Sequence, residues 1–141
     1  MNLDDMIKCI NRLLIDTTDV SVLSDCIEKY NTNDWMQYIT NTKSEISSCY
    51  NKNLIYRNTI YEIFLISWNE NASTPFHSHP KNGCILKILE GELNESYPDS
   101  SDKKRLYVGD VSYIGYNKYH KITSNTITYS LHIYSPPLFY S

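Results

Sequence analysis

The sequence predicts a mostly β protein in which a double-sheet barrel follows a short helical segment at the N-terminus. Two observations carry this prediction. Up to about residue 45, apolar side chains recur every three or four positions, which is typical of one buried helix face. From about residue 50, short runs rich in Ile, Tyr, Val and Thr are interrupted by turn residues roughly every 8–12 positions, which is typical of a β-sandwich or barrel.

The helical segment is expected to hold two helices and a short third one. The first has one apolar face, made of Leu3, Met6, Ile7, Ile10, Leu13 and Leu14. Asp19 is a candidate N-cap for the second helix. The apolar residues of that second helix are Val20, Leu23 and Ile27. The third runs from Asp34 to Ile39, and polar joints at 31–34 and 41–43 separate the three.

The remaining chain divides into short strands between turns. The expected strands are 54–58, 60–68, 77–79, 84–90, 92–97, 104–107, 111–114, 119–123 and 126–134. Gly91 and the segments 98–102, 109–110 and 115–118 carry the turn residues between them. Because 141 residues suffice to close one core, we expect a single domain over 1–141. It consists of a helical cap at 1–45 and a barrel at 50–137.

Composition excludes several classes of protein. Hydrophobic residues make up 41% and charged residues 21% of the chain, and the formal net charge is −3. The densest basic stretch is Lys103–Arg105, which is too short to form a nucleic-acid-binding stripe. No run approaches the roughly 20 apolar residues of a membrane helix. We therefore expect neither nucleic acid nor a membrane as a partner. We also expect the protein to be a monomer.

The cysteines and the N-terminus suggest a compartment. Cys9, Cys26, Cys49 and Cys84 form no CxxC pair and no dense disulfide framework. The opening stretch MNLDDMIKCI is acidic and lacks a long apolar run, so we expect no secretory or transit peptide. Both features favour a reducing, cytoplasmic location.

The stretch PFHSHPKNGC at 75–84 contains two of the four histidines. Residues i and i+2 of a strand share a face, so His77 and His79 would project into one space. By itself this pattern also suits a polar strand edge. His120 opens another β-run and would supply a third imidazole if its strand lies beside the first. Three imidazoles leave coordination positions open for substrate and oxygen, as in non-haem iron oxygenases, although zinc also accepts such a set.

The spacing resembles the first cupin motif: HSH, four residues, Cys84, six residues and Gly91. A second block from Gly109 to His120 resembles the second cupin motif. Most cupins carry a glutamate where this chain has Cys84, and that departure resembles the thiol dioxygenases, specifically the mammalian-type cysteine dioxygenase family. The resemblance runs roughly over 54–137. Four strings carry it: YRN (56–58), FLISW (64–68), ILKILEGELNES (85–96) and YSLHIYSPP (129–137).

The resemblance implies a cupin fold, a double-stranded β-helix or jelly-roll barrel, and an enzyme that oxidises L-cysteine with O2 to cysteine sulfinic acid. It implies that His77, His79 and His120 hold Fe(II). It also implies a thioether crosslink between Cys84 and Tyr134. Taken alone, Cys84 would be a buried hydrophobe, and Tyr134 is one of 13 tyrosines.

Ser130, His132 and Tyr134 alternate, so their side chains face the same way. They match a hydrogen-bonded row in the family, in which Ser130 would fix the tautomer of His132 and His132 would orient the Tyr134 hydroxyl. Arg57 matches the arginine that holds the substrate carboxylate, for which a guanidinium fork is well shaped. Trp68 matches a family tryptophan, although we favour a core role for it.

Several positions depart from the family pattern or test it. Ile55 stands where the family has a tyrosine. Gly83 stands where the family has a bulkier residue, and the smaller side chain would loosen the wall of the site next to Cys84. The chain stops at LFYS (138–141), whereas family members continue, which would widen the entrance. The Ser135–Pro136 bond is expected to be cis, as in the family.

The departures leave the substrate open. Another small carboxylate-bearing thiol, such as 3-mercaptopropionate, is the alternative substrate, and cysteamine ranks lowest because it has no carboxylate. A non-catalytic metal-binding cupin is the remaining reading.

Overall fold

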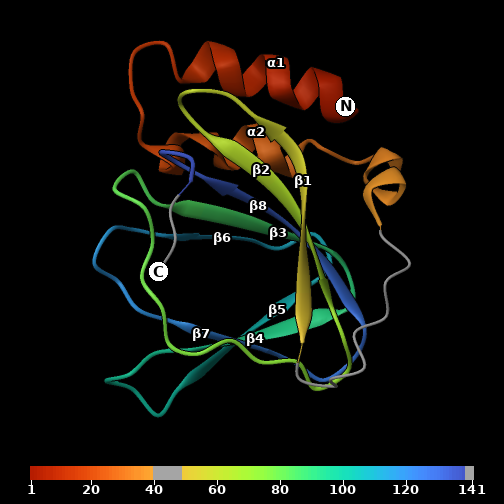
Figure 1. The fold of residues 1–141 in the computed structure, drawn as a ribbon, viewed down its shortest axis with the longest axis vertical. Helices are drawn as coiled ribbons and strands as arrows, with labels where there is room; N and C mark the ends of the chain where they lie inside the picture. Colours follow the sequence, from red (N-terminus) through yellow and green to blue (C-terminus); the bar gives the residue numbers. More distant parts are fainter. Residues whose placement is uncertain (40–48, 139–141) are drawn as a thin grey trace.

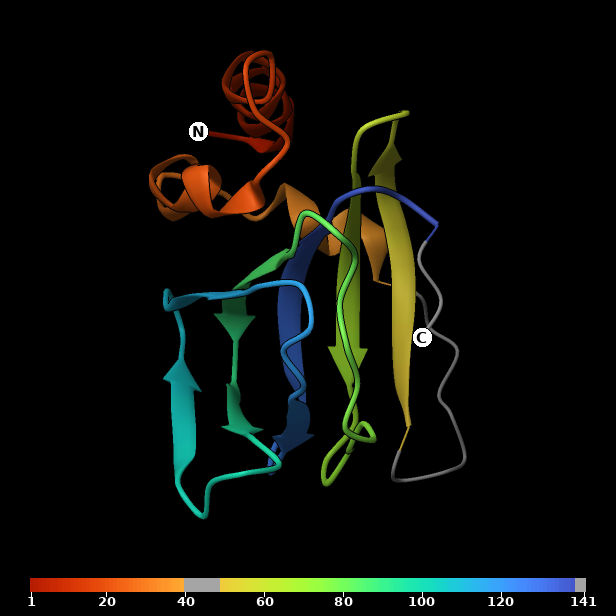
Figure 2. The ribbon, with the colours of Figure 1, turned by 90° about the vertical axis from the view of Figure 1, so that its left-hand side faces the viewer.

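The computed structural model describes residues 1–39 and 49–138. Two antiparallel sheets face each other, and the N-terminal helices cover the outer face of the larger sheet (Figures 1 and 2). The larger sheet has the strand order β1-β2-β8-β3-β6, and the smaller has the order β5-β4-β7. This arrangement confirms the predicted mostly β, jelly-roll architecture with a short helical segment before it.

The helix α1 and the 3-10 turn η1 begin where their capping residues predict. In α1 (Leu3–Leu13), the side chain of Asn2 accepts from the backbone N–H of Asp5 at 2.9 Å, and the Asp5 carboxylate accepts from the N–H of Asn2. Asp19 caps η1 (Val20–Leu23), a 3-10 turn that leads into the short α2 (Ser24–Glu28). The third predicted helix is the 3-10 helix η2 (Asp34–Tyr38). The predicted joint at 41–43 lies outside the described residues.

The strand bounds differ from the sequence expectation at few places. The structure has β1 (Tyr50–Arg57), β2 (Glu62–Trp68), β3 (Cys84–Glu90), β4 (Glu92–Ser96), β5 (Lys103–Tyr107), β6 (Val111–Ile114), β7 (Lys121–Ser124) and β8 (Thr128–Tyr134). The predicted strand at 77–79 is wrong. There the chain makes one isolated bridge, in which the backbones of His77 and His120 exchange hydrogen bonds of 3.0 and 3.1 Å.

The two faces of the larger sheet are both buried. Ile63 and Leu65 point outward and join the helices in one core cluster. Ile66 and Trp68 alternate with them and belong to a second cluster, between the sheets. Burial on both faces explains why FLISW is apolar at four of its five positions, without the regular polar alternation of a half-exposed strand.

A bulge near the end of β1 determines which of the last side chains of this strand point between the sheets. Leu54 pairs with Phe64, but the next pair is Tyr56 with Ile63, so Ile55 is the extra residue. The last pair places Arg57 opposite Glu62. Directly opposite residues share a face, so the bulge turns Arg57 inward, where uninterrupted alternation would have placed it on the outer face.

In the described part of the chain, no helix is both long and apolar enough to cross a membrane.

Candidate active site

Three histidines meet between the sheets. His77 and His79 lie in the loop before β3, and His120 immediately precedes β7. His120 Nε2 lies 2.9 Å from His79 Nε2 and 3.1 Å from His77 Nε2. The prediction that the three imidazoles share one space is confirmed, although an isolated bridge and not a strand brings His77 to His120.

The other nitrogen of each ring is tied to an oxygen. His77 Nδ1 donates to the carbonyl of Pro75 at 2.9 Å, and His79 Nδ1 donates to the carbonyl of Lys118 at 3.3 Å. His120 Nδ1 lies 3.1 Å from Glu95 Oε1. With the proton on Nδ1, a neutral imidazole carries its lone pair on Nε2. The three lone pairs therefore converge.

The electrostatics keep two of these rings neutral. Burial lowers the pKa of His77 to about 4, and it lowers the pKa of His79 to about 3, with the neighbouring histidines contributing further. Converging lone pairs repel each other unless a cation lies between them. Two nitrogens bound about 2.1 Å from one metal at a right angle would be about 3.0 Å apart, so the observed spacings fit a transition metal.

Glu95 is a site residue that the sequence reasoning missed. It lies on β4 and is 1% exposed. Besides His120, it accepts hydrogen bonds from Tyr97 at 2.8 Å and from Ser112 at 3.3 Å. Burial raises its pKa, but the hydrogen bonds from His120 and Tyr97 outweigh burial and hold the carboxyl below its ordinary value. Glu95 is two residues from the core residue Leu93, so the two side chains share a face of β4. This spacing was the signal in the sequence that Glu95 points inward.

The predicted row on β8 is present. Ser130 Oγ lies 2.7 Å from His132 Nε2, and the Tyr134 hydroxyl lies 3.4 Å from His132 Nδ1. Trp68 Nε1 donates to Ser130 Oγ at 2.8 Å. Trp68 is buried, in agreement with the core role that we favoured from the sequence. Its indole N–H also extends the hydrogen-bonded row by one residue before Ser130.

The row has a direction. An indole N–H only donates, so Ser130 accepts from Trp68 and has His132 Nε2 as the acceptor for its own proton. His132 then carries its proton on Nδ1 and donates toward the Tyr134 oxygen. The Tyr134 proton is thereby left to point away from His132. Burial, followed by the neighbouring Cys84, raises the pKa of Tyr134 well above its ordinary value, which keeps that proton in place.

Cys84 and Tyr134 stand directly opposite each other on β3 and β8, and their side chains are hydrogen bonded. Cys84 is a free thiol and is 1% exposed. Burial raises its pKa to about 12, although Lys52 and Tyr134 act in the opposite direction. The sequence therefore placed these two residues in contact correctly, while their covalent linkage stays a prediction.

Arg57 points between the sheets, toward the site, but it has a protein partner. Its Nε donates to Glu62 Oε2 at 2.7 Å, and the side chains of Arg57 and Glu62 are 35% and 5% exposed. The other oxygen of Glu62 accepts from the backbone N–H of Leu138 at 3.1 Å. The Nε of the guanidinium expected to clamp the substrate is thus engaged by a carboxylate of the chain itself.

The other departures have local explanations. Ile55 packs with the outer core cluster because it follows the inward-facing Leu54 and so points away from the site. Gly83 has φ 93°, and a Cβ there would lie 2.7 Å from the Tyr113 ring. The Tyr113 ring occupies the space that a bulkier residue at position 83 would take. The Ser135–Pro136 bond is cis, as predicted. Residues 139–141 of LFYS lie outside the described residues.

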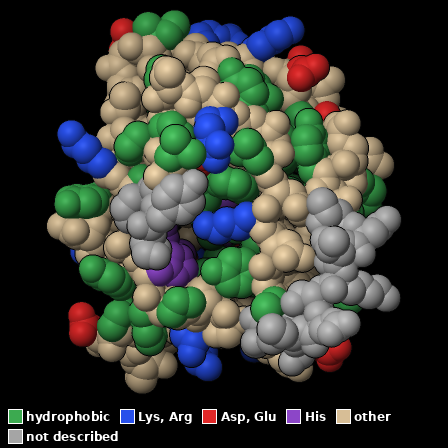
Figure 3. Space-filling model, viewed as in Figure 1, with side chains coloured by type: hydrophobic (Ala, Val, Ile, Leu, Met, Phe, Trp, Pro, Cys, Tyr) green, Lys and Arg blue, Asp and Glu red, His purple; other side chains and the backbone are tan. Residues whose placement is uncertain are grey.

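Lys52 is a second residue that the sequence reasoning missed. Its Nζ lies 5.1 Å from the Tyr134 ring centroid and 5.7 Å from that of Phe64. Figure 3 shows a histidine side chain at the surface with a basic side chain and apolar groups beside it. The site is therefore reachable from solvent on this face.

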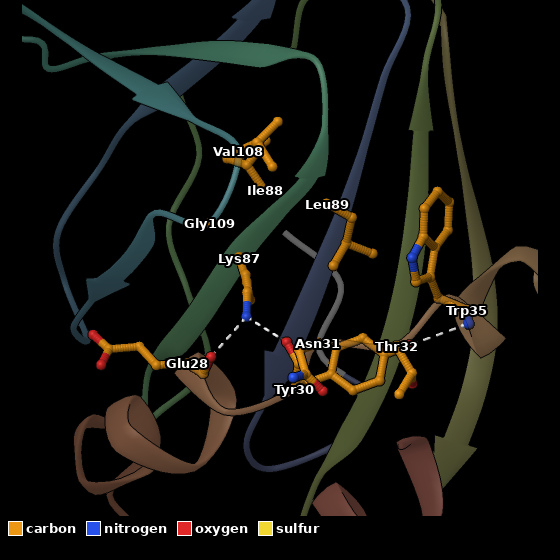
Figure 4. A pocket seen from close by; sticks show the side chains of 10 residues that line it. All are labelled: Glu28, Tyr30, Asn31, Thr32, Trp35, Lys87, Ile88, Leu89, Val108 and Gly109. Carbon is orange, nitrogen blue, oxygen red and sulfur yellow. Dashed lines mark hydrogen bonds between the residues drawn. The ribbon is translucent and has the colours of Figure 1, made fainter. Parts of the chain in front are cut away.

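Another hollow, of about 250 Å³, lies between the helical segment and β3 (Figure 4). Lys87 lines it, but its ammonium donates to the carbonyls of Ile27, Glu28 and Tyr30 at 3.0, 3.0 and 2.6 Å. Three donors meet three acceptors, so Lys87 fixes the end of α2 to the sheet and has no donor left for a ligand.

The fold and the three converging histidines define a cupin with a site that could hold a metal ion. Among solved structures, a double-stranded β-helix protein from Klebsiella pneumoniae has a TM-score of 0.62 at 11% identity, covering 77% of this chain and 91% of that one. An RmlC-like cupin from Desulfovibrio desulfuricans has a TM-score of 0.59 at 17% identity, covering 77% and 98%.

The chain belongs to the cysteine dioxygenase type I family, whose model matches residues 2–140. Cysteine dioxygenase type 1 of Danio rerio is 27% identical over 154 residues, covering 96% of this chain and 75% of the relative. That of Rattus norvegicus is 26% identical over 155 residues, covering 96% and 74%. The protein is therefore an oxidoreductase of the oxygenase class, as the sequence motifs predicted.

Proposed function

We propose that the protein is an Fe(II)-dependent thiol dioxygenase that converts L-cysteine and O2 to cysteine sulfinic acid. The observation that carries this proposal is the convergence of three imidazole Nε2 atoms whose Nδ1 atoms are each tied to an oxygen. Membership of the cysteine dioxygenase type I family supports the reaction class.

His77, His79 and His120 would hold the iron through Nε2. Bound there, Fe(II) supplies the redox chemistry that adds both atoms of O2 to the thiol sulfur. Because all three protein ligands are imidazoles, the ligand set contributes no negative charge. The site therefore favours an anionic thiolate over a neutral thiol as the substrate form.

The row from Trp68 to Tyr134 would position one proton. Ser130 and His132 fix the orientation of the Tyr134 hydroxyl, and its raised pKa keeps it a donor at neutral pH. We propose that this hydroxyl donates to the substrate or to oxygen at the site. The thioether between Cys84 and Tyr134 would hold the tyrosine ring in place, and their contact supports it.

The alternative substrate is another small carboxylate-bearing thiol, such as 3-mercaptopropionate. The observation that favours it is the bulge, which turns Ile55 and Tyr56 to the outer face and leaves no tyrosine beside Arg57 on β1. Cytoplasmic location and a monomeric state stay predictions. The four free cysteines support a reducing compartment.

The test is aerobic incubation of the Fe(II)-reconstituted protein with L-cysteine, 3-mercaptopropionate and cysteamine, with oxygen uptake and sulfinate measured together. Cysteine sulfinic acid with about one O2 consumed per product supports the proposal. A different sulfinate moves the assignment to the alternative thiol. Iron binding without any product would favour a non-catalytic cupin.

A further inference from the structure

Lys52 is a cation that projects into the site. Before the bulge, β1 pairs Lys52 with Ile66 of β2, and Ile66 belongs to the core cluster between the sheets. Lys52 therefore points inward. Its side chain leans along the inner face of the sheet, so that Nζ lies over Phe64 of β2 and Tyr134 of β8. Lys52 as a whole is exposed, which places this residue at the mouth of the site.

The charged and titratable groups that face Lys52 are those of the site itself. Its charge acts on His77 and His132, adding to the effect of burial on their pKa values. Burial lowers the pKa of Lys52, while Cys84 and Glu62 oppose that shift. Glu62 is the anion among these groups, but its oxygens accept from Arg57 and from the backbone of Leu138.

Lys52 forms no ion pair with any residue that the structure describes, whereas Arg57 forms one. A substrate carboxylate approaching Arg57 would meet the negative charge of Glu62, 2.7 Å from the same guanidinium. An approach to Lys52 meets aromatic ring faces and an ammonium whose three donors bond to none of the residues that the structure describes.

We propose that the ammonium of Lys52 binds the carboxylate of the thiol substrate and thereby selects carboxylate-bearing thiols. Arg57 then serves chiefly to neutralise Glu62. This inference rests on the proposed function, because the ligand is the thiol that the histidine site would oxidise. It also predicts discrimination against cysteamine, whose own ammonium would face Lys52 with a like charge.

The experiment compares the wild type with Lys52→Met, Lys52→Arg and Arg57→Gln, all loaded with Fe(II). Methionine keeps an unbranched chain over Phe64 and Tyr134 but removes the charge. We expect Lys52→Met to raise KM for L-cysteine and 3-mercaptopropionate about tenfold or more, since a hydrogen bond to a charged group is lost. KM for cysteamine should stay unchanged or fall. Lys52→Arg should restore most of the selectivity.

Two results would overturn the inference. An equal rise in KM for all three thiols in Lys52→Met would show a structural role. A carboxylate-selective loss in Arg57→Gln alone would return the clamp to Arg57.

Anaerobic calorimetric titration of L-cysteine and cysteamine into the same proteins separates this inference from the proposed function. If the wild type turns over no thiol, the proposed function fails, while weaker binding of L-cysteine to Lys52→Met still supports Lys52. If L-cysteine binds both proteins equally, or neither, the inference fails.

Discussion

Glu95 Oε1 lies 3.1 Å from His120 Nδ1, and the two side chains are 1% and 2% exposed. This buried carboxylate fixes which nitrogen of His120 is free to bind a metal. It connects the smaller sheet to the histidine site, because Glu95 lies on β4 and His120 immediately precedes β7, the strand that pairs with β4.

Glu95→Gln is predicted to weaken metal binding. The amide keeps the shape of the side chain but removes the charge, and it can present an N–H to His120 in place of an acceptor. We expect affinity for Zn²⁺, used as a redox-inert probe, to fall about tenfold to a hundredfold, as for other partners of metal-ligating histidines. Competition with a chromogenic chelator measures it.

Ser112→Ala is the matched control, since it removes a hydroxyl that donates to Glu95 but leaves the carboxylate. Its Zn²⁺ affinity should change by less than about threefold. Equal losses in both variants would contradict the role assigned to the Glu95 charge.

The metal-free protein is predicted to lose stability as pH falls below about 6.5. The folded-state pKa values of His77 and His79, about 4 and about 3, lie below the ordinary 6.5, so the unfolded chain binds more protons in this window. Stability is therefore highest above 6.5 and declines as pH falls toward 4. Thermal unfolding of the metal-free protein at pH 7, 6 and 5 measures this loss.

A His79→Gln variant should show a flatter Tm profile between pH 7 and 5, because it lacks one of the buried histidines, with His77 and His132, whose pKa values are lowered. The lowered pKa of Glu95 acts in a separate window, below its ordinary 4.5. A wild-type Tm that does not change from pH 7 to 5 would refute the assignment of these histidines as buried neutral groups.

Ser130→Ala is predicted to lower kcat more than it changes KM. Without the hydroxyl, His132 has no proton donor at Nε2 and its tautomer is no longer fixed, so the Tyr134 proton loses its direction. We expect kcat to fall about tenfold to a hundredfold. Steady-state oxygen uptake with the best thiol substrate measures both constants.

Ser67→Ala is the control for this substitution. Ser67 lies on the neighbouring strand β2, and its buried hydroxyl has no hydrogen-bond partner within 1–39 and 49–138. This variant should keep its kcat. A kcat for Ser130→Ala equal to that of the wild type would contradict the proposed proton positioning.

Cys84 is predicted to form a thioether with Tyr134 during aerobic turnover. Intact-mass spectrometry should show a species two hydrogens lighter than the unmodified chain. Cys84→Gly should abolish this species and keep measurable activity. Cys26→Ala is the control, because Cys26 is a buried thiol that contacts the Met6 carbonyl and not Tyr134. This variant should still form the lighter species. The lighter species appearing in Cys84→Gly would exclude this crosslink.

The sequence predicted the elements whose evidence is local. The two-residue spacing of Ser130, His132 and Tyr134 puts them on one strand face wherever that strand lies, and the structure confirms the row. The three histidines were also found, because the cupin spacing is itself a local motif. The strand expected at 77–79 was wrong because alternation alone does not supply a pairing partner along its length.

What was missed depends on register between distant strands. The extra residue Ile55 decides the face of Arg57, and nothing in YRN shows that bulge. Glu62 and Lys52 acquire their importance only because β1, β2 and β8 lie side by side. Short-range patterns do not contain that information, so the ion pair of Arg57 with Glu62 was not predicted.

One assay decides whether the three converging imidazoles hold iron for thiol oxidation. Fe(II)-reconstituted wild type and His120→Ala are incubated with L-cysteine in air, and sulfinate is quantified against oxygen consumed. We expect cysteine sulfinic acid at about one O2 per product in the wild type and none above background in His120→Ala. Equal sulfinate from both proteins, or oxygen uptake without sulfinate in the wild type, would contradict it.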